Sequence, residues 1–215
     1  MSVGRALKKA LVDLYGQSWR LVVLNLAVAG IALLVALAAV TSATPAGLLL
    51  LAIVGPFAAA LMHCAVTLQQ TDKLRLRDGI VGLRLHWRRG LALGAAGAVV
   101  ALLAVTAVSF WSSHGILAWP LSVLALYLAL MFAVWQIHLW PLAVAGPPAL
   151  GDVFRDSGAA LARRPLASCA LALALLLVNA VGAIGILPVL SITVAYSALA
   201  AAHFALPPPT EEATA

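Results

Sequence analysis

Charge is scarce in this sequence. Only 9% of its 215 residues are Asp, Glu, Lys or Arg, whereas 64% are hydrophobic. A soluble globular domain has about 25% charged residues, so this chain has too few to cover a surface that faces water. The high hydrophobicity also excludes an intrinsically disordered chain. The composition therefore predicts an all-α, polytopic membrane protein, which at about 20 residues per span has room for roughly six or seven helices.

Cysteine is rare as well. Cys64 and Cys169 are the only two cysteines, and both lie in apolar runs. Neither belongs to a Cys-x-x-Cys motif or to a Cys/His ligand spacing. We therefore expect both thiols to be buried and to form neither a disulfide nor a zinc site.

The sequence motifs of several enzyme classes are missing. There is no GxxxxGK[ST] phosphate-binding loop, no HExxH zinc motif and no GxSxG serine motif. No Asp, Glu, Lys or Arg lies in the middle of an apolar stretch, although proton-coupled transporters usually carry an intramembrane carboxylate. The sequence thus predicts a protein that is not an enzyme and that has no catalytic residue, metal site or cofactor.

Long apolar stretches are what the sequence has in abundance. They predict six membrane spans, at residues 21–40, 46–68, 91–110, 116–142, 166–181 and 186–204. The first stretch is longer than the hydrophobic region of a signal peptide, so we expect an uncleaved span. The last two stretches form one apolar run that as a straight helix would be about 60 Å long, twice the hydrocarbon thickness. Gly182, Gly185 and Pro188 favour a break between two spans, with a re-entrant segment as the alternative.

The charged residues define one side of the membrane. With six spans, all 13 Lys and Arg residues and all 7 acidic residues lie on the side of the N-terminus. The positive-inside rule then predicts that both termini are cytoplasmic. We expect residues 1–206 to form a single transmembrane domain, and the proline-rich and acidic residues 207–215 to form a disordered cytoplasmic tail.

An amphipathic stretch precedes each pair of spans, at residues 5–19, 75–89 and 150–164. This order indicates a threefold repeat of surface helix, span, turn and span, although any cytoplasmic loop tends to be basic and amphipathic. The second stretch begins with Arg75 and carries four further arginines, which are Arg77, Arg84, Arg88 and Arg89. They predict either an interfacial helix on anionic lipids or a docking surface for a cytoplasmic partner. Nucleic acid is not expected as a partner, because the arginines lie too close to the membrane.

Polar residues within spans are the default functional candidates in a membrane protein. Asn25, His63, Gln136 and His138 share one depth near the cytoplasmic ends of three predicted spans, which predicts a cavity open to the cytoplasm. The alternative is hydrogen bonding between helices that only stabilises packing. His63 and His138, without a carboxylate or thiolate beside them, would make a poor metal site.

The most specific motifs lie in the centre of the chain and near its start. They are Gly55-Pro56, the segment from Leu76-Arg77-Asp78 to Trp87-Arg88-Arg89-Gly90, and the residues Leu14-Tyr15, Trp19-Arg20 and Leu24-Asn25-Leu26. These motifs resemble the YesL-like family of bacterial integral membrane proteins of unknown function. The resemblance implies a location in the bacterial inner membrane. It also implies an accessory role in sugar import, because family members are often encoded beside carbohydrate-uptake transporters.

The sequence therefore favours a non-enzymatic accessory or scaffold protein. Its expected partners are membrane lipids and either a transporter subunit or a second copy of the chain. The alternative function is a conduit for a small solute or an ion through the predicted polar cavity. An intramembrane enzyme that acts on lipid is the third hypothesis, and it lacks a catalytic constellation.

Overall fold

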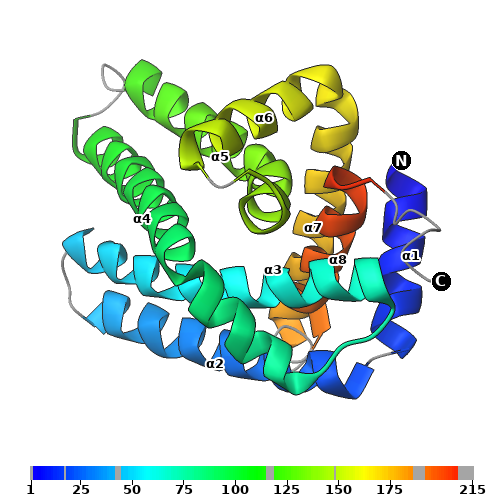
Figure 1. The fold of residues 1–215 in the computed structure, drawn as a ribbon. Coiled ribbons are helices and arrows are strands. Elements are labelled where there is room, and N and C mark those ends of the chain that lie inside the picture. Colours follow the sequence, from blue (N-terminus) through cyan, green and yellow to red (C-terminus); the bar gives the residue numbers. More distant parts are fainter. Residues whose placement is uncertain are drawn as a thin grey trace.

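The structure is a computed structural model that describes residues 2–16, 18–41, 45–114, 119–147, 149–185 and 192–207. Within these ranges the chain is helical and has no strand, which confirms the predicted all-α fold (Figure 1). The α-helices are α1 (Val3–Gly16), α2 (Ser18–Thr41), α3 (Val54–Thr71), α4 (Leu76–His114), α5 (Trp119–Ala145), α6 (Leu150–Arg163), α7 (Pro165–Gly185) and α8 (Val194–Ala205). A 3₁₀ segment, η1 (Pro45–Ile53), leads directly into α3.

Five helical segments are long and apolar enough to cross a membrane. They are Trp19–Ala39, Leu49–Thr71, Leu76–Phe110, Trp119–Ala145 and Pro165–Gly182, and they contain or overlap the first five predicted spans. The protein is therefore a membrane-embedded helical bundle. This conclusion agrees with the large apolar side chains that α2, α4, α5 and α7 leave exposed, because lipid covers such side chains in a membrane.

The sixth predicted span corresponds to α8, an apolar helix of 12 residues. Residues 186–191, which include the expected break at Pro188, lie outside the described residues. The length of this span, and the choice between two spans and a re-entrant segment, therefore stay predictions. The predicted disordered tail also lies outside the described residues from residue 208 onward.

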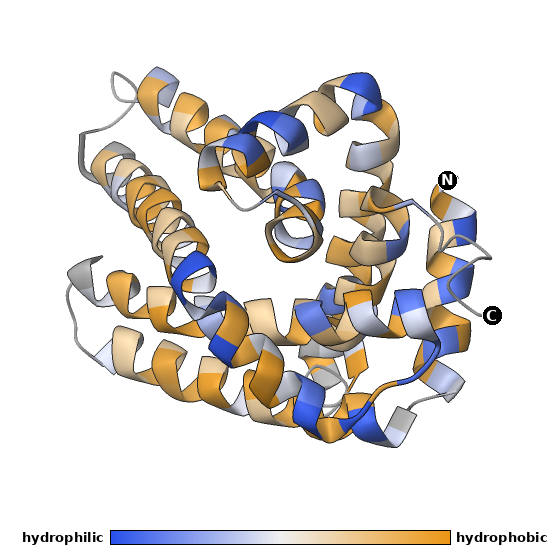
Figure 2. Cartoon of the chain, in the orientation of Figure 1, coloured by the Kyte–Doolittle hydropathy of each residue, from blue (hydrophilic) through white to orange (hydrophobic). Residues whose placement is uncertain are grey.

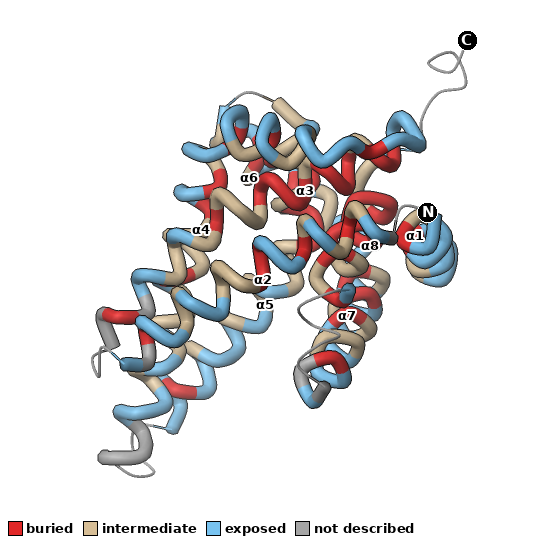
Figure 3. The backbone as a smooth tube through the Cα atoms, turned by 90° about the horizontal axis from the view of Figure 1, so that it is seen from below, coloured by how far each residue is buried: buried red, intermediate tan, exposed pale blue. Residues whose placement is uncertain are grey.

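Hydrophilic residues gather in a few helices of the bundle. Figure 2 shows them along α1 and α6 and in the first half of α4, whereas α2 and the second half of α4 are mostly hydrophobic. In Figure 3, α6 lies toward the top of the view and the C-terminal end of α7 lies lower down. Hydrophilic residues are thus concentrated in α1, α6 and the first half of α4. That the charged residues lie on one side of a membrane stays a prediction.

The second amphipathic stretch differs from the prediction, because it is not a separate surface helix. Residues 76–89 and the following span form one uninterrupted helix, α4, of 39 residues. Its basic residues can continue a helix, whereas α6 ends at Arg163 because Pro165 disfavours the helical conformation of the residue before it. A separate surface helix therefore exists in the first and third units of the predicted repeat, as α1 and α6, and is fused to the span in the second unit.

The core lies around α3 and α8, which hold the largest share of buried residues (Figure 3). Leu199, Ala200 and Ala202 of α8 are completely buried, and α8 contacts α1, α3 and α5. Cys64 is buried in this core, as predicted. The prediction for Cys169 is wrong: this thiol is exposed and lines a cavity of about 430 Å³ between α5, α7 and α8.

Three glycines let α4 cross the η1–α3 segment with the two backbones in contact. A Cβ added to Gly55 would overlap the carbonyl oxygen of Gly90, and one added to Gly90 would lie 2.7 Å from the carbonyl oxygen of Gly55. A Cβ on Gly94 would lie 2.6 Å from the Ala52 carbonyl oxygen. Small residues permit such close helix packing in membranes. This glycine crossing sets the direction in which the first half of α4 leaves the bundle.

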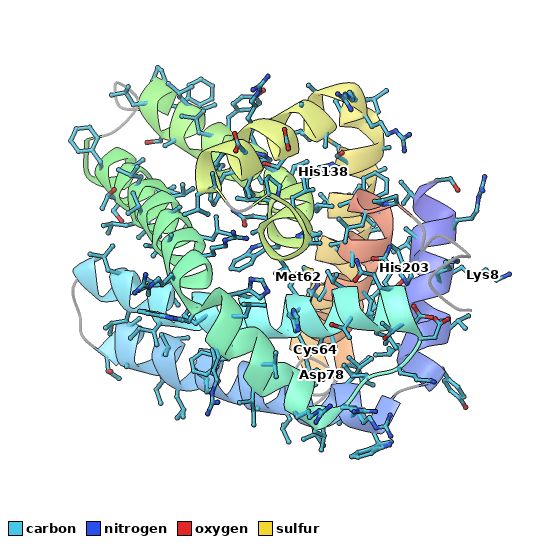
Figure 4. All side chains as sticks on the ribbon, viewed as in Figure 1. Lys8, Met62, Cys64, Asp78, His138 and His203 are labelled. Carbon is cyan, nitrogen blue, oxygen red and sulfur yellow. The ribbon has the colours of Figure 1, made fainter. Side chains whose placement is uncertain are left out.

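The first and the last described helices, α1 and α8, pack against each other. Ala6 and Ala10 of α1 are fully buried, and the Tyr196 hydroxyl donates a hydrogen bond to the Leu7 carbonyl at 3.3 Å. The imidazole Nε2 of His203 lies 2.6 Å from a carboxylate oxygen of Asp13. Figure 4 shows His203 on α8 facing α1. These contacts attach the amphipathic helix α1 to the side of the bundle.

Candidate functional site

The four residues predicted to line one cavity come from α2, α3 and α5. Asn25 and His138 are buried, whereas His63 and Gln136 are partly exposed. Of the four, His138 lines a described cavity, which has a volume of about 280 Å³. A single cavity lined by all four residues stays a prediction.

His63 packs against a histidine that the sequence did not single out. Its ring centroid lies 5.3 Å from that of His86 on α4. Gly82 makes room for this ring, because a Cβ at Gly82 would lie 2.8 Å from the Cβ of His63. Both ring nitrogens of His86 are buried without a hydrogen-bond partner. Two imidazoles are too few for a stable metal site, and within the described ranges no group of three or more His, Cys, Asp or Glu side chains could hold a metal ion.

His138 is held between α5, α7 and α8 (Figure 4). Its Nε2 lies 2.8 Å from the Ser168 hydroxyl oxygen, and its ring centroid lies 5.5 Å from that of Phe204. The Ser168 hydroxyl donates its only proton to the Arg164 carbonyl at 3.0 Å, so it accepts from Nε2–H of His138. In the neutral imidazole, Nδ1 is therefore an acceptor, and it is buried without a partner.

The cavity beside His138 lies where α6 ends and α7 begins. Its walls also include Arg163, Arg164 and the end of α8 from Phe204 to Pro207. Both arginine side chains are exposed. The salt bridge that the described part of the chain contains is the one between Asp13 and His203, so neither arginine is paired with a described carboxylate. We call this space the α6–α7 cavity.

Three of the four arginines predicted for docking form an exposed face on the first half of α4. Arg77, Arg84 and Arg88 are exposed, and Val81, which lies between them on the same face, is 49% exposed. The spacing i, i+4, i+7, i+11 aligns these residues along one side of the helix. Together they form what we call the α4 basic face. The Arg88 guanidinium carbon lies 5.3 Å from the Trp87 ring centroid, which restrains that side chain.

Arg89, the fourth predicted docking residue, points into the bundle. Its guanidinium Nη1 donates a hydrogen bond to the Ala143 carbonyl at 2.9 Å. Ala143 lies in the last turn of α5, where the carbonyl groups have no N–H donor within the helix. Arg89 therefore links α4 to α5 and is a structural residue.

Sequence reasoning missed two participants in these sites. His86 was overlooked because its position in the sequence does not reveal how α4 is rotated about its own axis, and this rotation turns His86 toward His63. Ser168 was overlooked because a serine in an apolar run usually bonds to its own helix. A visible signal existed for the second site: Arg163-Arg164-Pro165 combines charge with a helix break at a membrane entry.

The chain was compared with models of protein families, with curated proteins and with solved structures, and no match was found. The resemblance to the YesL-like family therefore stays a prediction.

Proposed function

We propose that this protein is a non-enzymatic accessory subunit of the bacterial inner membrane that docks a partner on the cytoplasmic side. The docking element is the α4 basic face, and the partner surface it fits is acidic. Both termini and all the basic residues lie on the cytoplasmic side in this proposal, as the positive-inside rule favours. If the resemblance of its motifs to the YesL-like family holds, the partner is a transporter for carbohydrate uptake.

The observation that carries the proposal is the continuity of α4. Its 39 residues correspond to a length of about 58 Å, whereas the hydrocarbon core is about 30 Å thick. A large part of the helix therefore extends beyond the hydrocarbon, and the glycine crossing fixes its direction. An interfacial helix that only binds lipid needs no such rigid connection to a span.

The charges on this face favour an acidic protein surface. Arg77, Arg84 and Arg88 are exposed, and no ion pair joins them to a described carboxylate. Ile80 and Leu85 flank the face and are 59% and 66% exposed. Apolar residues beside unpaired arginines are a composition typical of protein interfaces.

The test is co-purification in a mild detergent. We expect the wild-type chain to retain a membrane partner. In the triple variant Arg77→Gln, Arg84→Gln and Arg88→Gln, the amount of partner that co-purifies should fall by about tenfold or more, because three charge-assisted contacts are removed. Raising the salt concentration should also lower the amount of partner retained, because salt screens the attraction between exposed charges.

The matched control changes three other exposed basic residues, which lie on α1. In Arg5→Gln, Lys8→Gln and Lys9→Gln the net charge falls by the same amount, so partner retention should stay near the wild-type level. Equal retention by both triple variants, or a wild-type chain that purifies alone, would contradict the proposal.

A further inference from the structure

The α6–α7 cavity combines positive charge with a buried group that lacks a partner. Arg163 and Arg164 line it and have no described carboxylate beside them. The cavity also lies at the start of α7, a helix of 21 residues whose N-terminal end carries the positive pole of the helix dipole. Anions are the ligands that such an environment attracts.

His138 adds a specific requirement to this attraction. It is 3% exposed, lines the cavity, and presents Nδ1 as an acceptor without a partner, because its Nε2 is held by Ser168. An unpaired buried acceptor is costly, so a ligand that shares a proton with Nδ1 gains a hydrogen bond that the free protein lacks.

A phosphate monoester meets both requirements. It is an anion with three terminal oxygens, and its second pKa of about 6 means that it carries a dissociable proton near neutral pH. Whichever partner holds that proton, one hydrogen bond forms between Nδ1 and a phosphate oxygen. A phosphodiester or a sulfate has no such proton at neutral pH.

We propose that the α6–α7 cavity is a binding site for a phosphate monoester, with Arg163 and Arg164 as the charge partners and His138 as the residue that distinguishes a monoester from other anions. The volume of about 280 Å³ fits a phosphate group and a few more atoms, below the usual range for drug-sized ligands. The site does not depend on the docking role of α4.

The phosphate has two possible sources. Pro165 begins a candidate membrane span, so the cavity lies where a span enters the membrane, at the depth of lipid headgroups. The monoester headgroup of a phosphatidic acid could therefore enter from the lipid side, and a soluble phosphate monoester could enter from the water side.

The experiment uses the full chain in a neutral detergent after removal of lipid. Binding of glycerol 3-phosphate and of sulfate is measured by isothermal titration calorimetry. In parallel, the chain is placed in nanodiscs that contain phosphatidylcholine with either phosphatidic acid or phosphatidylglycerol, and the lipid retained on re-extraction is measured by mass spectrometry. Binding in the first arm identifies a soluble ligand, and selective retention of phosphatidic acid in the second arm identifies a lipid.

Two variants separate charge from proton sharing. In Arg163→Gln with Arg164→Gln, both changes are at exposed positions, so the fold should survive and the affinity for every anion should fall by about tenfold or more. In His138→Gln, the amide nitrogen can keep the bond to Ser168 while Nδ1 is lost. We expect the preference for monoester over sulfate or over phosphatidylglycerol to disappear, with anion binding retained.

The control is Arg5→Gln with Lys9→Gln, which removes the same charge at two exposed positions of α1 and should leave anion binding unchanged. The proposal is overturned if neither arm shows binding, if the two double variants weaken binding equally, or if the chain shows no preference for monoesters over sulfate and phosphatidylglycerol.

Discussion

The Gly90→Ala variant is expected to unfold at a clearly lower temperature than the wild-type chain. The added methyl carbon would lie 2.7 Å from the carbonyl oxygen of Gly55 and 2.7 Å from the Cα of Pro56, and both are backbone atoms. A flexible side chain could move away, but here the η1–α3 segment and α4 must separate. Overpacking of this kind typically costs about 1–3 kcal/mol, and a clash between backbones lies at the upper end.

Gly30→Ala is the matched control for this prediction. Gly30 also lies inside a membrane helix, and an added Cβ there meets no atom within 4 Å. Since alanine favours a helix over glycine by about 1 kcal/mol, this variant should be neutral or slightly more stable. The measurement is the unfolding temperature in detergent, followed by intrinsic fluorescence. If the two alanine variants unfold together, α4 does not cross α3 at Gly90.

The second large effect is expected from a proline in the first half of α4. In Leu85→Pro the helix loses one hydrogen bond and the ring clashes with the preceding turn, at a cost of about 3 kcal/mol. Leu85 is 66% exposed, so little side-chain packing is lost with it. The kink would reorient the residues before it, including Arg77 and Val81, relative to the membrane-spanning half of α4. We therefore expect partner retention to fall as far as in the triple arginine variant.

Leu76→Pro is the control, because α4 begins at Leu76 and proline is tolerated at the first position of a helix. We expect near-normal stability, measured by thermal unfolding, and normal partner retention. A Leu85→Pro chain that still binds its partner would mean that the rigid continuation of α4 is not needed for docking.

The sequence predicted the membrane-embedded, all-α character of the fold well, for a physical reason. Hydropathy and length depend on the bilayer, whose thickness is nearly constant, so residues such as 21–40 and 116–142 indicate spans without knowledge of their neighbours. The break between α6 and α7 was also readable, because Pro165 restricts the residue before it.

The parts that the sequence could not predict depend on rotation and contact. The depth of His63 was readable, but its packing against His86 depends on how α4 turns about its own axis, which Gly82 and the glycine crossing decide. The continuity of α4 was missed because residues 75–89 were predicted as a surface helix separate from the span, although Arg88 and Arg89 are good helix formers. Arg89 was wrongly assigned to the docking surface. Its hydrogen bond to Ala143 joins residues 54 positions apart, and a contact of this kind cannot be read from the sequence.

The central claim is that the basic face of α4 contacts a protein and that the apolar half of the same helix contacts lipid. Val81 and Val105 lie on these two halves and have nearly equal exposure, 49% and 46%. The most direct measurement places a photoreactive amino acid at one of the two positions in living cells and identifies the adducts by mass spectrometry. We predict a protein adduct from position 81 and only lipid adducts from position 105. If position 81 gives only lipid adducts, α4 lies on the membrane along its whole length and the docking proposal is wrong.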